Sequence, residues 1–390
     1  MKRRLPLWIL LLLPLLLAGC ATNTEYLSLT PHVEQYTQPT SPTEADPIPV
    51  VTNRPELRGA ILSLIDTWQE QGIILIRDYD GDVEQNLSEV MNYATREHPT
   101  GAYAVDYADA EIVEEDGQQM VQVSFVFRRS PSEINSIVLV DNNVAAYAKI
   151  KDALCNYNTA LTLRIRHYSD WDFEDAIVGY CMENPRLIPA IPEFSLKLYP
   201  EEGEHRIMEL HFTYPESKDS MRGKLADLET PLQSALSYGR SGDSPRDRAQ
   251  RMGNYLIRRQ DQVLTDTAPT MPVYSLLADN IGHDLSYAVC YNDLCASLGI
   301  RSYIIRGTKN GEPYYWNFLQ FGEEAFHVDL RYYVENGITS MYPLYDEDLL
   351  SMGYTWDQDS YTAASVTPYT ETVPDATEST DSEVSDTPDS

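Results

Sequence analysis

Basic residues are scarce in this chain of 390 residues, which has 29 Lys and Arg against 60 Asp and Glu. The formal net charge is therefore −31. We expect nucleic acids and anionic lipid surfaces to be repelled, and no basic cluster in the sequence offsets this charge. The composition argues against nucleic acid as a partner and otherwise indicates little more than good solubility.

Cysteine is also rare, with five residues in the whole chain. Four of them, Cys155, Cys181, Cys290 and Cys295, lie in the body of the sequence, and their spacing fixes no disulfide pairing. Cys290 and Cys295 are five residues apart on one predicted helix, which is a poor arrangement for a bond between them. No C-x-x-C pair or Cys/His cluster indicates zinc, so the sequence predicts neither a metal site nor a cofactor.

Long apolar runs are missing after the first twenty residues. The N-terminus has a basic segment, Lys2-Arg3-Arg4, then an apolar run from Leu5 to Leu17, then Leu17-Ala18-Gly19-Cys20. This order resembles the signal peptide (1–19) and lipobox of bacterial lipoproteins. The resemblance implies lipidation of Cys20 and an extracytoplasmic protein that is anchored to a membrane by lipid, with a net charge of −34 once the basic segment is removed. An ordinary signal peptide with a chance cysteine is the alternative.

Both ends of the chain have compositions that disfavour a packed core. Residues 20–54 are rich in Thr, Pro, Ser and Glu, and we expect them to form an extended spacer. Residues 363–390 are mostly Thr, Ser, Asp, Glu and Pro without a basic residue, and we expect a disordered acidic tail. The folded body is therefore expected between these two segments.

Residues 55–240 carry a pattern of predicted strands and helices that occurs twice. In the first copy, a strand near Ile73 is followed by a helix, two strands and a second helix over 144–153. In the second copy, a strand over 161–168 is followed by the same order, which ends in a helix over 221–236. The strings V-S-F-V-F-R-R and M-E-L-H-F-T-Y match at an offset of roughly 85 residues. The pattern predicts two β-α-β-β-α units in an α+β protein, although the copies share no signature residues.

One turn of the first copy has the acidic spacing of an EF-hand calcium loop. The sequence D-Y-D-G-D-V-E-Q-N-L-S-E, from Asp78 to Glu89, has carboxylates at positions one, three, five and twelve. However, Val83 stands at position six, where such a loop requires glycine, and Gln85 stands at position eight instead of an apolar residue. The equivalent turn of the second copy is also acidic, so carboxylates that stabilise a helix N-terminus are the simpler interpretation.

Residues 244–361 hold the most specific motifs of the chain. Tyr287-Ala288 and Leu298-Gly299-Ile300 mark the two ends of a predicted helix, and Trp316-Asn317 and Val328-Asp329 lie on two predicted strands. These four motifs resemble the core of the transglutaminase-like (papain-related) superfamily. The resemblance implies an α+β domain in which a helix packs on an antiparallel sheet.

The resemblance also shows which catalytic residues are missing. The family's helix opens with G-x-C-x-x-Y-A, whereas this chain reads G-H-D-L-S-Y-A and has Asp284 at the position of the nucleophilic cysteine. The family's histidine lies two residues before the tryptophan, where this chain has Tyr314. The third residue of the family's catalytic triad is an aspartate, and it is retained here, because F-H-V-D places Asp329 at its position. We therefore expect Asp284 to be a helix N-cap and not a nucleophile.

Three alternatives could restore catalysis. Cys290 is the nearest thiol, but it lies six residues inside the helix, away from the helix N-terminus that would activate it. His327 shares a strand face with Asp329, so the aspartate could orient its imidazole. Asp284 and Asp329 could also form a pair of carboxylates for acid–base chemistry.

The missing Cys/His pair favours a non-catalytic binding or scaffold module at the cell envelope. Tyr315, Trp316 and Asn317 lie near the expected cleft and could contact an envelope protein, a peptide or a glycan. The alternative function is an active thiol-dependent peptidase or acyl transferase that uses Cys290 or an unrecognised arrangement. A purely structural role in envelope assembly is a third interpretation.

Overall fold

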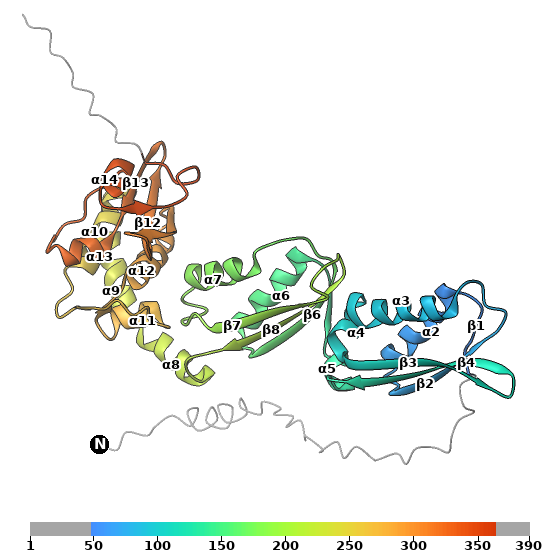
Figure 1. Cartoon of the computed structure of the whole chain (residues 1–390). Helices are drawn as coiled ribbons and strands as arrows, with labels where there is room; N and C mark the ends of the chain where they lie inside the picture. The colour runs from blue at the N-terminus through green and yellow to red at the C-terminus, as the bar shows by residue number, and fades with distance from the viewer. Residues whose placement is uncertain (1–47, 364–390) are drawn as a thin grey trace, which may run out of the picture. The chain divides into compact units, whose positions relative to one another are not determined.

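The computed structural model describes residues 48–363 of the chain. Cys20, most of the predicted spacer and the predicted tail beyond Ala363 lie outside the described residues. Helices and strands are combined throughout the described part, so the protein is of the α+β class, as the sequence predicted (Figure 1). Within residues 48–363, no helix is both long enough and apolar enough to cross a membrane.

Residues 50–127 form a first unit, in which helices cover one face of a four-stranded sheet (Figure 1). Its elements are β1 (Val50–Val51), α2 (Arg54–Asp66), β2 (Gln71–Ile76), α3 (Val83–Asn92), the π-helix η1 (Tyr93–Glu97), α4 (Pro99–Ala104), β3 (Val105–Glu115) and β4 (Gln118–Phe127). The strand order is β1-β2-β4-β3, with a parallel β1–β2 pair and antiparallel pairs elsewhere in the sheet. Val121, Val123 and Phe125 alternate along β4 toward the core, because strand side chains alternate between faces.

Residues 138–213 form a second unit, which follows the short helix α5 (Pro131–Asn135). Its elements are β5 (Val138–Asn142), α6 (Asn143–Cys155), β6 (Ala160–His167), α7 (Phe173–Glu183), β7 (Glu193–Tyr199) and β8 (Arg206–Thr213). The strand order is β5-β6-β8-β7, again with a parallel first pair. The two units therefore share their strand order and their pattern of strand pairing.

Each unit has the core order β-α-β-α-β-β and not the predicted β-α-β-β-α. The helix over 144–153, which we expected to end the first unit, is α6 and lies between the first two strands of the second unit. The sequence missed the opening strands because β1 has two residues and β5 has five, too few for a clear periodicity. The predicted spacer also ends too late, since Val50 and Val51 already pair with β2.

Equivalent helices of the two units begin with the same capping residues. Asn53 caps α2 and Asn142 caps α6, and each side chain accepts a hydrogen bond of 3.0 Å from the amide three residues later. Asp82 caps α3 and Asp172 caps α7 in the same way, at 3.0 and 2.8 Å. These caps satisfy amides that the first helical turn leaves without partners. They are shared signature residues that the sequence comparison did not identify.

The acidic turn from Asp78 to Glu89 serves local structure. Asp82 caps α3, and Oε2 of Glu89 lies 2.7 Å from Nη1 of Arg54. In the described part of the chain, no group of three or more His, Cys, Asp or Glu is arranged to hold a metal ion. Because Asp82 caps α3 and Glu89 pairs with Arg54, the structure supports the capping interpretation of this turn.

A third region, residues 218–363, contains the motifs that resemble the transglutaminase-like core (Figure 1). Its elements are α8 (Lys218–Asp227), α9 (Glu229–Arg240), α10 (Pro245–Ile257), β9 (Val263–Leu264), α11 (Pro272–Leu277), β10 (Ile281–Gly282), α12 (Asp284–Ser297), β11 (Ser302–Lys309), β12 (Glu312–Phe321), β13 (Glu324–Val328), α13 (Leu330–Glu335), α14 (Asp346–Ser351) and β14 (Tyr354–Thr355). The main sheet has the antiparallel order β13-β12-β11-β14. Residues 284–295 of α12 are all buried, so this helix is the centre of the domain.

Three predicted boundaries in this region are wrong. The helix predicted over 221–236 is two helices, α8 and α9, because Pro231 in the first turn of α9 cannot donate the hydrogen bond that would join them. Leu232 and Leu236 of α9 belong to the core around α12, so the domain begins before residue 244. The last predicted strand ends at Val328, because Asp329 caps the helix α13.

The turn after α12 explains the Leu298-Gly299-Ile300 motif. Gly299 has a φ of 69°, a left-handed conformation that glycine adopts without strain. Its amide donates to the carbonyl of Ala296 at 3.0 Å, and the Ile300 amide donates to the carbonyl of Cys295 at 2.9 Å. This pair of bonds is the Schellman motif, which satisfies the last carbonyls of a helix.

Candidate functional site

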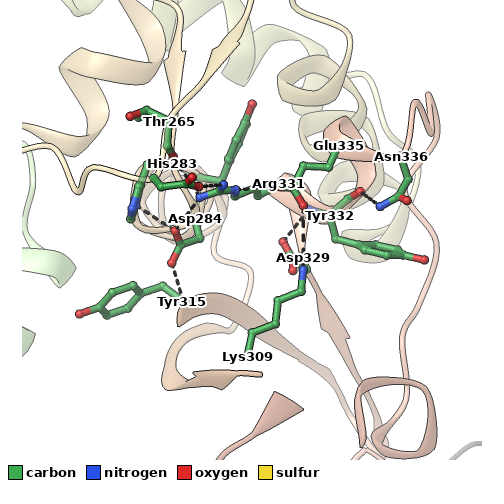
Figure 2. Close-up of polar contacts among 12 residues, drawn as sticks. Thr265, His283, Asp284, Lys309, Tyr315, Asp329, Arg331, Tyr332, Glu335 and Asn336 are labelled. Atoms are coloured by element: carbon green, nitrogen blue, oxygen red, sulfur yellow. Dashed lines mark hydrogen bonds and ion pairs between the residues drawn. The ribbon is translucent and has the colours of Figure 1, made fainter. Parts of the chain in front are cut away.

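The N-terminus of α12 is the position at which the resemblance places the nucleophile. His283 is the N-cap, and its Nδ1 accepts a hydrogen bond from the Leu285 amide at 3.1 Å. Asp284 is the first helical residue, so our expectation that it would be the N-cap is wrong. The Asp284 carboxylate instead points toward β12, where it meets the backbone of Tyr315 (Figure 2).

The Asp284 side chain is 3% exposed, and both of its oxygens have partners. Oδ2 accepts a hydrogen bond from the Tyr315 amide at 2.9 Å, and Oδ1 accepts one from Nη1 of Arg331 at 3.3 Å. Nδ1 of His283 also lies 3.0 Å from Oδ1, but it accepts from the Leu285 amide and so has no proton to donate in this arrangement. Arg331 is therefore the cation that compensates the buried carboxylate.

Arg331 binds four groups, which come from α12, from the segment after β9 and from its own helix α13 (Figure 2). Besides Asp284, its guanidinium binds Oδ1 of Asp266 at 2.5 Å, Oε1 of Glu335 at 2.7 Å and the carbonyl of Thr265 at 3.1 Å. The residue is 9% exposed, and burial by itself would lower its pKa. The hydrogen bonds to Asp266 and Glu335 outweigh burial and raise the pKa of Arg331, so the guanidinium stays charged.

Tyr314 stands where the resemblance places the catalytic histidine, and it is a buried phenol. Burial, with a contribution from Asp329, raises the pKa of Tyr314 far above its usual range. Its hydroxyl makes no hydrogen bond of acceptable geometry with the residues that the structure describes. The ring packs edge-on against Tyr354, with 5.6 Å between centroids. A neutral phenol of this kind cannot take a proton from a thiol at neutral pH.

Asp329, the third triad position, has both oxygens engaged in structural contacts. Oδ1 accepts from the Tyr332 amide at 2.9 Å and so caps α13, and Oδ2 accepts from the Tyr354 hydroxyl at 2.6 Å. Burial raises the pKa of Asp329, although these hydrogen bonds oppose the shift. Tyr354 thus supplies the hydrogen-bond donor to Asp329 that the sequence resemblance had assigned to an imidazole.

The three alternatives for catalysis are not supported by the geometry. Cys290 is 0% exposed, and burial raises its thiol pKa well above the usual range. His327 accepts from the indole N–H of Trp316 at its Nδ1, and its Nε2 lies 3.0 Å from Oδ1 of Asp346. This arrangement places the ring proton on Nε2, and burial lowers the pKa of His327, so the imidazole is neutral. Asp329 is bound by Tyr354 and does not orient that ring.

Asp284 and Asp329 do not form a pair for acid–base chemistry, because each carboxylate has its own partners. Arg331 binds Asp284, whereas Tyr354 and the Tyr332 amide bind Asp329. Two carboxylates act together in acid–base chemistry only if they share a proton or face the same substrate. These two are instead occupied in separate structural contacts.

Two of the three residues expected near a cleft lie in the core. Trp316 and Asn317 are each 1% exposed, and Nδ2 of Asn317 donates to the Ala288 carbonyl at 3.0 Å. The expectation is therefore wrong for both residues, because β12 is a central strand that packs directly on α12. Tyr315 alone remains partly exposed.

Arg331 and Tyr354 define this site, and neither was predicted from the sequence. Arg331 follows Asp329 by two residues, so a search for cations near the motif could have identified it. Tyr354 lies on a two-residue strand, and nothing in its local sequence indicates that it reaches Asp329. Both contacts bridge distant parts of the chain, 47 residues apart for Arg331 and Asp284 and 25 for Tyr354 and Asp329.

Comparisons with known proteins find no matching family model and no matching curated protein. One similar solved structure is the crystal structure of a TGase, with a TM-score of 0.25, 10% identity and coverage of 50% of this chain and 59% of that chain. Another is a candidate protease from Parabacteroides distasonis, with a TM-score of 0.20, 9% identity and coverage of 66% of this chain and 39% of that chain. The chain thus spans less than two thirds of the length of either protein, and both likenesses concern the fold alone.

Proposed function

We propose that the C-terminal region is a transglutaminase-like domain without thiol chemistry, which acts as a binding or scaffold module. The observation that carries this proposal is the buried pair of Asp284 and Arg331 at the nucleophile position. A thiol nucleophile requires a sulfur atom, a base that can accept its proton and a group that orients the base. Here the three positions hold an ion-paired carboxylate, the neutral phenol of Tyr314 and a carboxylate bound by Tyr354.

Activity assays of the full chain test this proposal. The purified protein is incubated with amide and ester substrates, with and without an amine acceptor, beside the Cys290→Ser variant. We expect no turnover above the buffer control for either protein, because Cys290 is buried and lacks a base. Turnover by the wild type that the Cys290→Ser variant loses would contradict the proposal and favour a thiol-dependent peptidase or acyl transferase.

Rebuilding the triad tests the assignment of positions. Asp284→Cys with Tyr314→His restores the two missing residues, and adding Tyr354→Phe removes the hydroxyl that occupies Asp329. We expect thiol-dependent ester hydrolysis in the triple variant and less in the double variant, whose imidazole competes with Tyr354 for Asp329. Asp284→Cys alone is the matched control, since its thiol has no base. If the triple variant and this control are equally inactive although both are folded, the assigned positions are wrong.

We also propose that the protein is an extracytoplasmic lipoprotein anchored through Cys20. Support comes from the order of basic segment, apolar run and lipobox in the sequence. Cell fractionation of wild type and Cys20→Ser tests the anchor. The wild type should partition with membranes and into detergent, and Cys20→Ser should not. Equal membrane partitioning of both proteins would exclude lipid attachment at this cysteine.

A further inference from the structure

A second polar cluster lies on α10, and it lines a cavity of about 520 Å³. The cavity is lined by side chains of α9, of α10 and of the two residues after α10: Tyr238, Asp247, Gln250, Arg251, Asn254, Tyr255, Arg258 and Arg259. This volume is within the range of small-molecule sites in proteins. None of these residues contributes to the network around Asp284 and Arg331, so the cavity is a separate site.

The lining residues of α10 form one face of the helix. Residues 247, 250, 251, 254, 255 and 258 recur at helical spacing, whereas Ala249, Met252 and Leu256 occupy the opposite, buried face. Tyr238 of α9 borders the polar face, and its ring lies 5.3 Å from the ring of Tyr255. The polar face of α10 is thus one wall of a recess.

The cavity carries a local positive charge in a strongly acidic chain. Arg251, Arg258 and Arg259 face one acidic residue, Asp247, which lies 3.0 Å from Nε of Arg251. The chain as a whole has a formal charge of −31, and the sequence predicted no basic cluster that offsets it. The cavity is nevertheless locally basic, because the helical spacing places Arg251 on the same face as Arg258, which Arg259 follows directly in the sequence.

Two of these arginines have hydrogen-bond donors without an acceptor among the described residues. Arg258 donates from Nε to the Thr339 carbonyl at 2.7 Å, and no described residue accepts from its Nη groups. Arg259 donates through Nη2 to the Leu277 carbonyl at 2.8 Å and to Oδ1 of Asn280 at 2.5 Å, while its buried Nε has no partner within residues 48–363. Buried donors without an acceptor, such as Nε of Arg259, are rare in folded proteins, and the Nη groups of Arg258 are exposed and open to a ligand acceptor.

The remaining polar side chains hold the cavity in shape. Nε2 of Gln250 donates to the Met341 carbonyl at 3.0 Å, and Oδ1 of Asn254 accepts from the Met341 amide at 2.7 Å. Both side chains are thereby fixed to the segment after α13. A site that is already ordered loses little entropy when it binds a ligand.

We infer that this cavity binds an oxyanion, a carboxylate or a phosphate, that is carried on a ring. A guanidinium group can donate paired hydrogen bonds to two oxygens of a carboxylate or a phosphate, and the rings of Tyr238 and Tyr255, which line the cavity, can pack against an aromatic or sugar ring. The inference does not depend on the absence of catalysis at Asp284, since the two sites share no residue.

Isothermal titration of the full chain with four small probes tests this inference. Phenyl phosphate and benzoate carry both a ring and an anion, phenol carries only the ring, and inorganic phosphate carries only the anion. We expect phenyl phosphate or benzoate to bind at millimolar or lower concentration and at least about tenfold more tightly than phenol and inorganic phosphate. The stronger of the two ring anions identifies the preferred oxyanion.

Variants locate the binding. Arg258→Gln should weaken the preferred probe about tenfold or more, because it removes the guanidinium fork, and Tyr238→Ala should also weaken it. Arg240→Gln is the matched control, since it removes one positive charge from α9 outside the cavity lining and should change the affinity less than about twofold. If Arg258→Gln is unfolded by circular dichroism, Arg258→Lys keeps the charge but loses the fork and should still weaken binding. No binding of either ring anion, or equal losses for Arg240→Gln and the Arg258 variant, would overturn the inference.

Discussion

The C-terminal domain contains two arginine sites that differ in how completely their polar groups are paired. At the start of α12, Arg331 is 9% exposed, and its guanidinium is bound by Asp284, Asp266, Glu335 and a carbonyl. On α10, Arg251 and Arg258 are exposed, and Arg258 has one protein acceptor among the described residues. The first arginine is committed to the structure, whereas the second retains donors for a ligand.

This difference shows that the identity of a residue does not determine its role. Both sites combine arginine, carboxylate and tyrosine, and burial together with the number of internal acceptors separates them. A buried cation that lost its partners would destabilise the fold, so the first site contributes to stability. An exposed guanidinium costs little when it is removed, so the second site is constrained by what it binds.

The strongest test of the comparison removes the buried cation. We expect Arg331→Met to lower the free energy of unfolding by about 3–5 kcal/mol, because it leaves Asp284 buried without a counter-charge. Urea unfolding followed by circular dichroism measures the change. Adding Asp284→Asn should recover part of the loss, since the amide carries no charge. A loss below about 0.5 kcal/mol would show that Arg331 is not needed to compensate the buried Asp284 carboxylate.

A smaller effect is expected from the close packing beside Asp284. A Cβ atom on residue 282 would lie 2.6 Å from the hydroxyl and 2.8 Å from a ring carbon of the buried Tyr287. Gly282→Ala should therefore cost about 1–3 kcal/mol in the same unfolding assay. Gly117→Ala is an unsuitable control because of its positive φ, whereas Gly59→Ala in α2 meets no atom within 4 Å and should not destabilise the protein. Equal stability of the wild type and Gly282→Ala would mean that Tyr287 can move.

The pH dependence of stability tests the charge at Asp329. Burial raises the folded-state pKa of this acid, so its protonated form is favoured in the folded protein. The resulting stabilisation is present below the unfolded pKa, about 3.9, and is lost as the pH rises through the folded pKa. Wild type should therefore lose stability relative to Asp329→Asn between pH 4 and neutrality, because the amide keeps one of the two acceptor oxygens at every pH and cannot ionise. A constant difference between the two proteins over this range would contradict the shift.

The smallest effect on stability is expected at the α10 cavity. Arg258→Gln should change the free energy of unfolding by less than about 0.5 kcal/mol, since the arginine is exposed and makes one contact with the Thr339 carbonyl. The same urea assay measures it beside Arg331→Met. A large loss for Arg258→Gln would remove the distinction between the two sites.

The sequence predicted the parts of this fold that depend on local patterns. The α+β class, the helix before Leu298-Gly299-Ile300 and the central strand with Trp316 follow from periodicity and from turn residues. It did not predict β1 or β14, each two residues long, because pairing with a neighbouring strand and not local propensity makes them strands. Asn53 and Asn142 can be recognised as equivalent helix caps of the two units only when the short strands β1 and β5 before them are known.

The sequence placed Asp284, Tyr314 and Asp329 at the triad positions, but it could not show what those side chains contact. Their partners Arg331 and Tyr354 are distant or weakly marked in the chain, and tertiary folding brings them together. The α10 cavity was hidden for a different reason. Its polar residues are separated along the chain by the apolar residues of the buried face, and helical spacing brings them together on the other face.

The hydroxyl of Tyr354 has a consequence for the timing of folding. This hydroxyl, on strand β14, donates a hydrogen bond to Asp329. The Ala363 amide donates to Oδ1 of Asp346, and the same oxygen is the partner of Nε2 of His327. A nascent chain that has not yet reached these positions would have to bury Asp329 and His327 without the partners that the complete domain provides. We therefore expect the domain to be unable to fold stepwise from its beginning and to close in one late event, after residue 363 has been synthesised. Ribosome-bound chains that stop at Gly353 should accordingly remain sensitive to protease, whereas chains that extend well past Ala363 should become resistant.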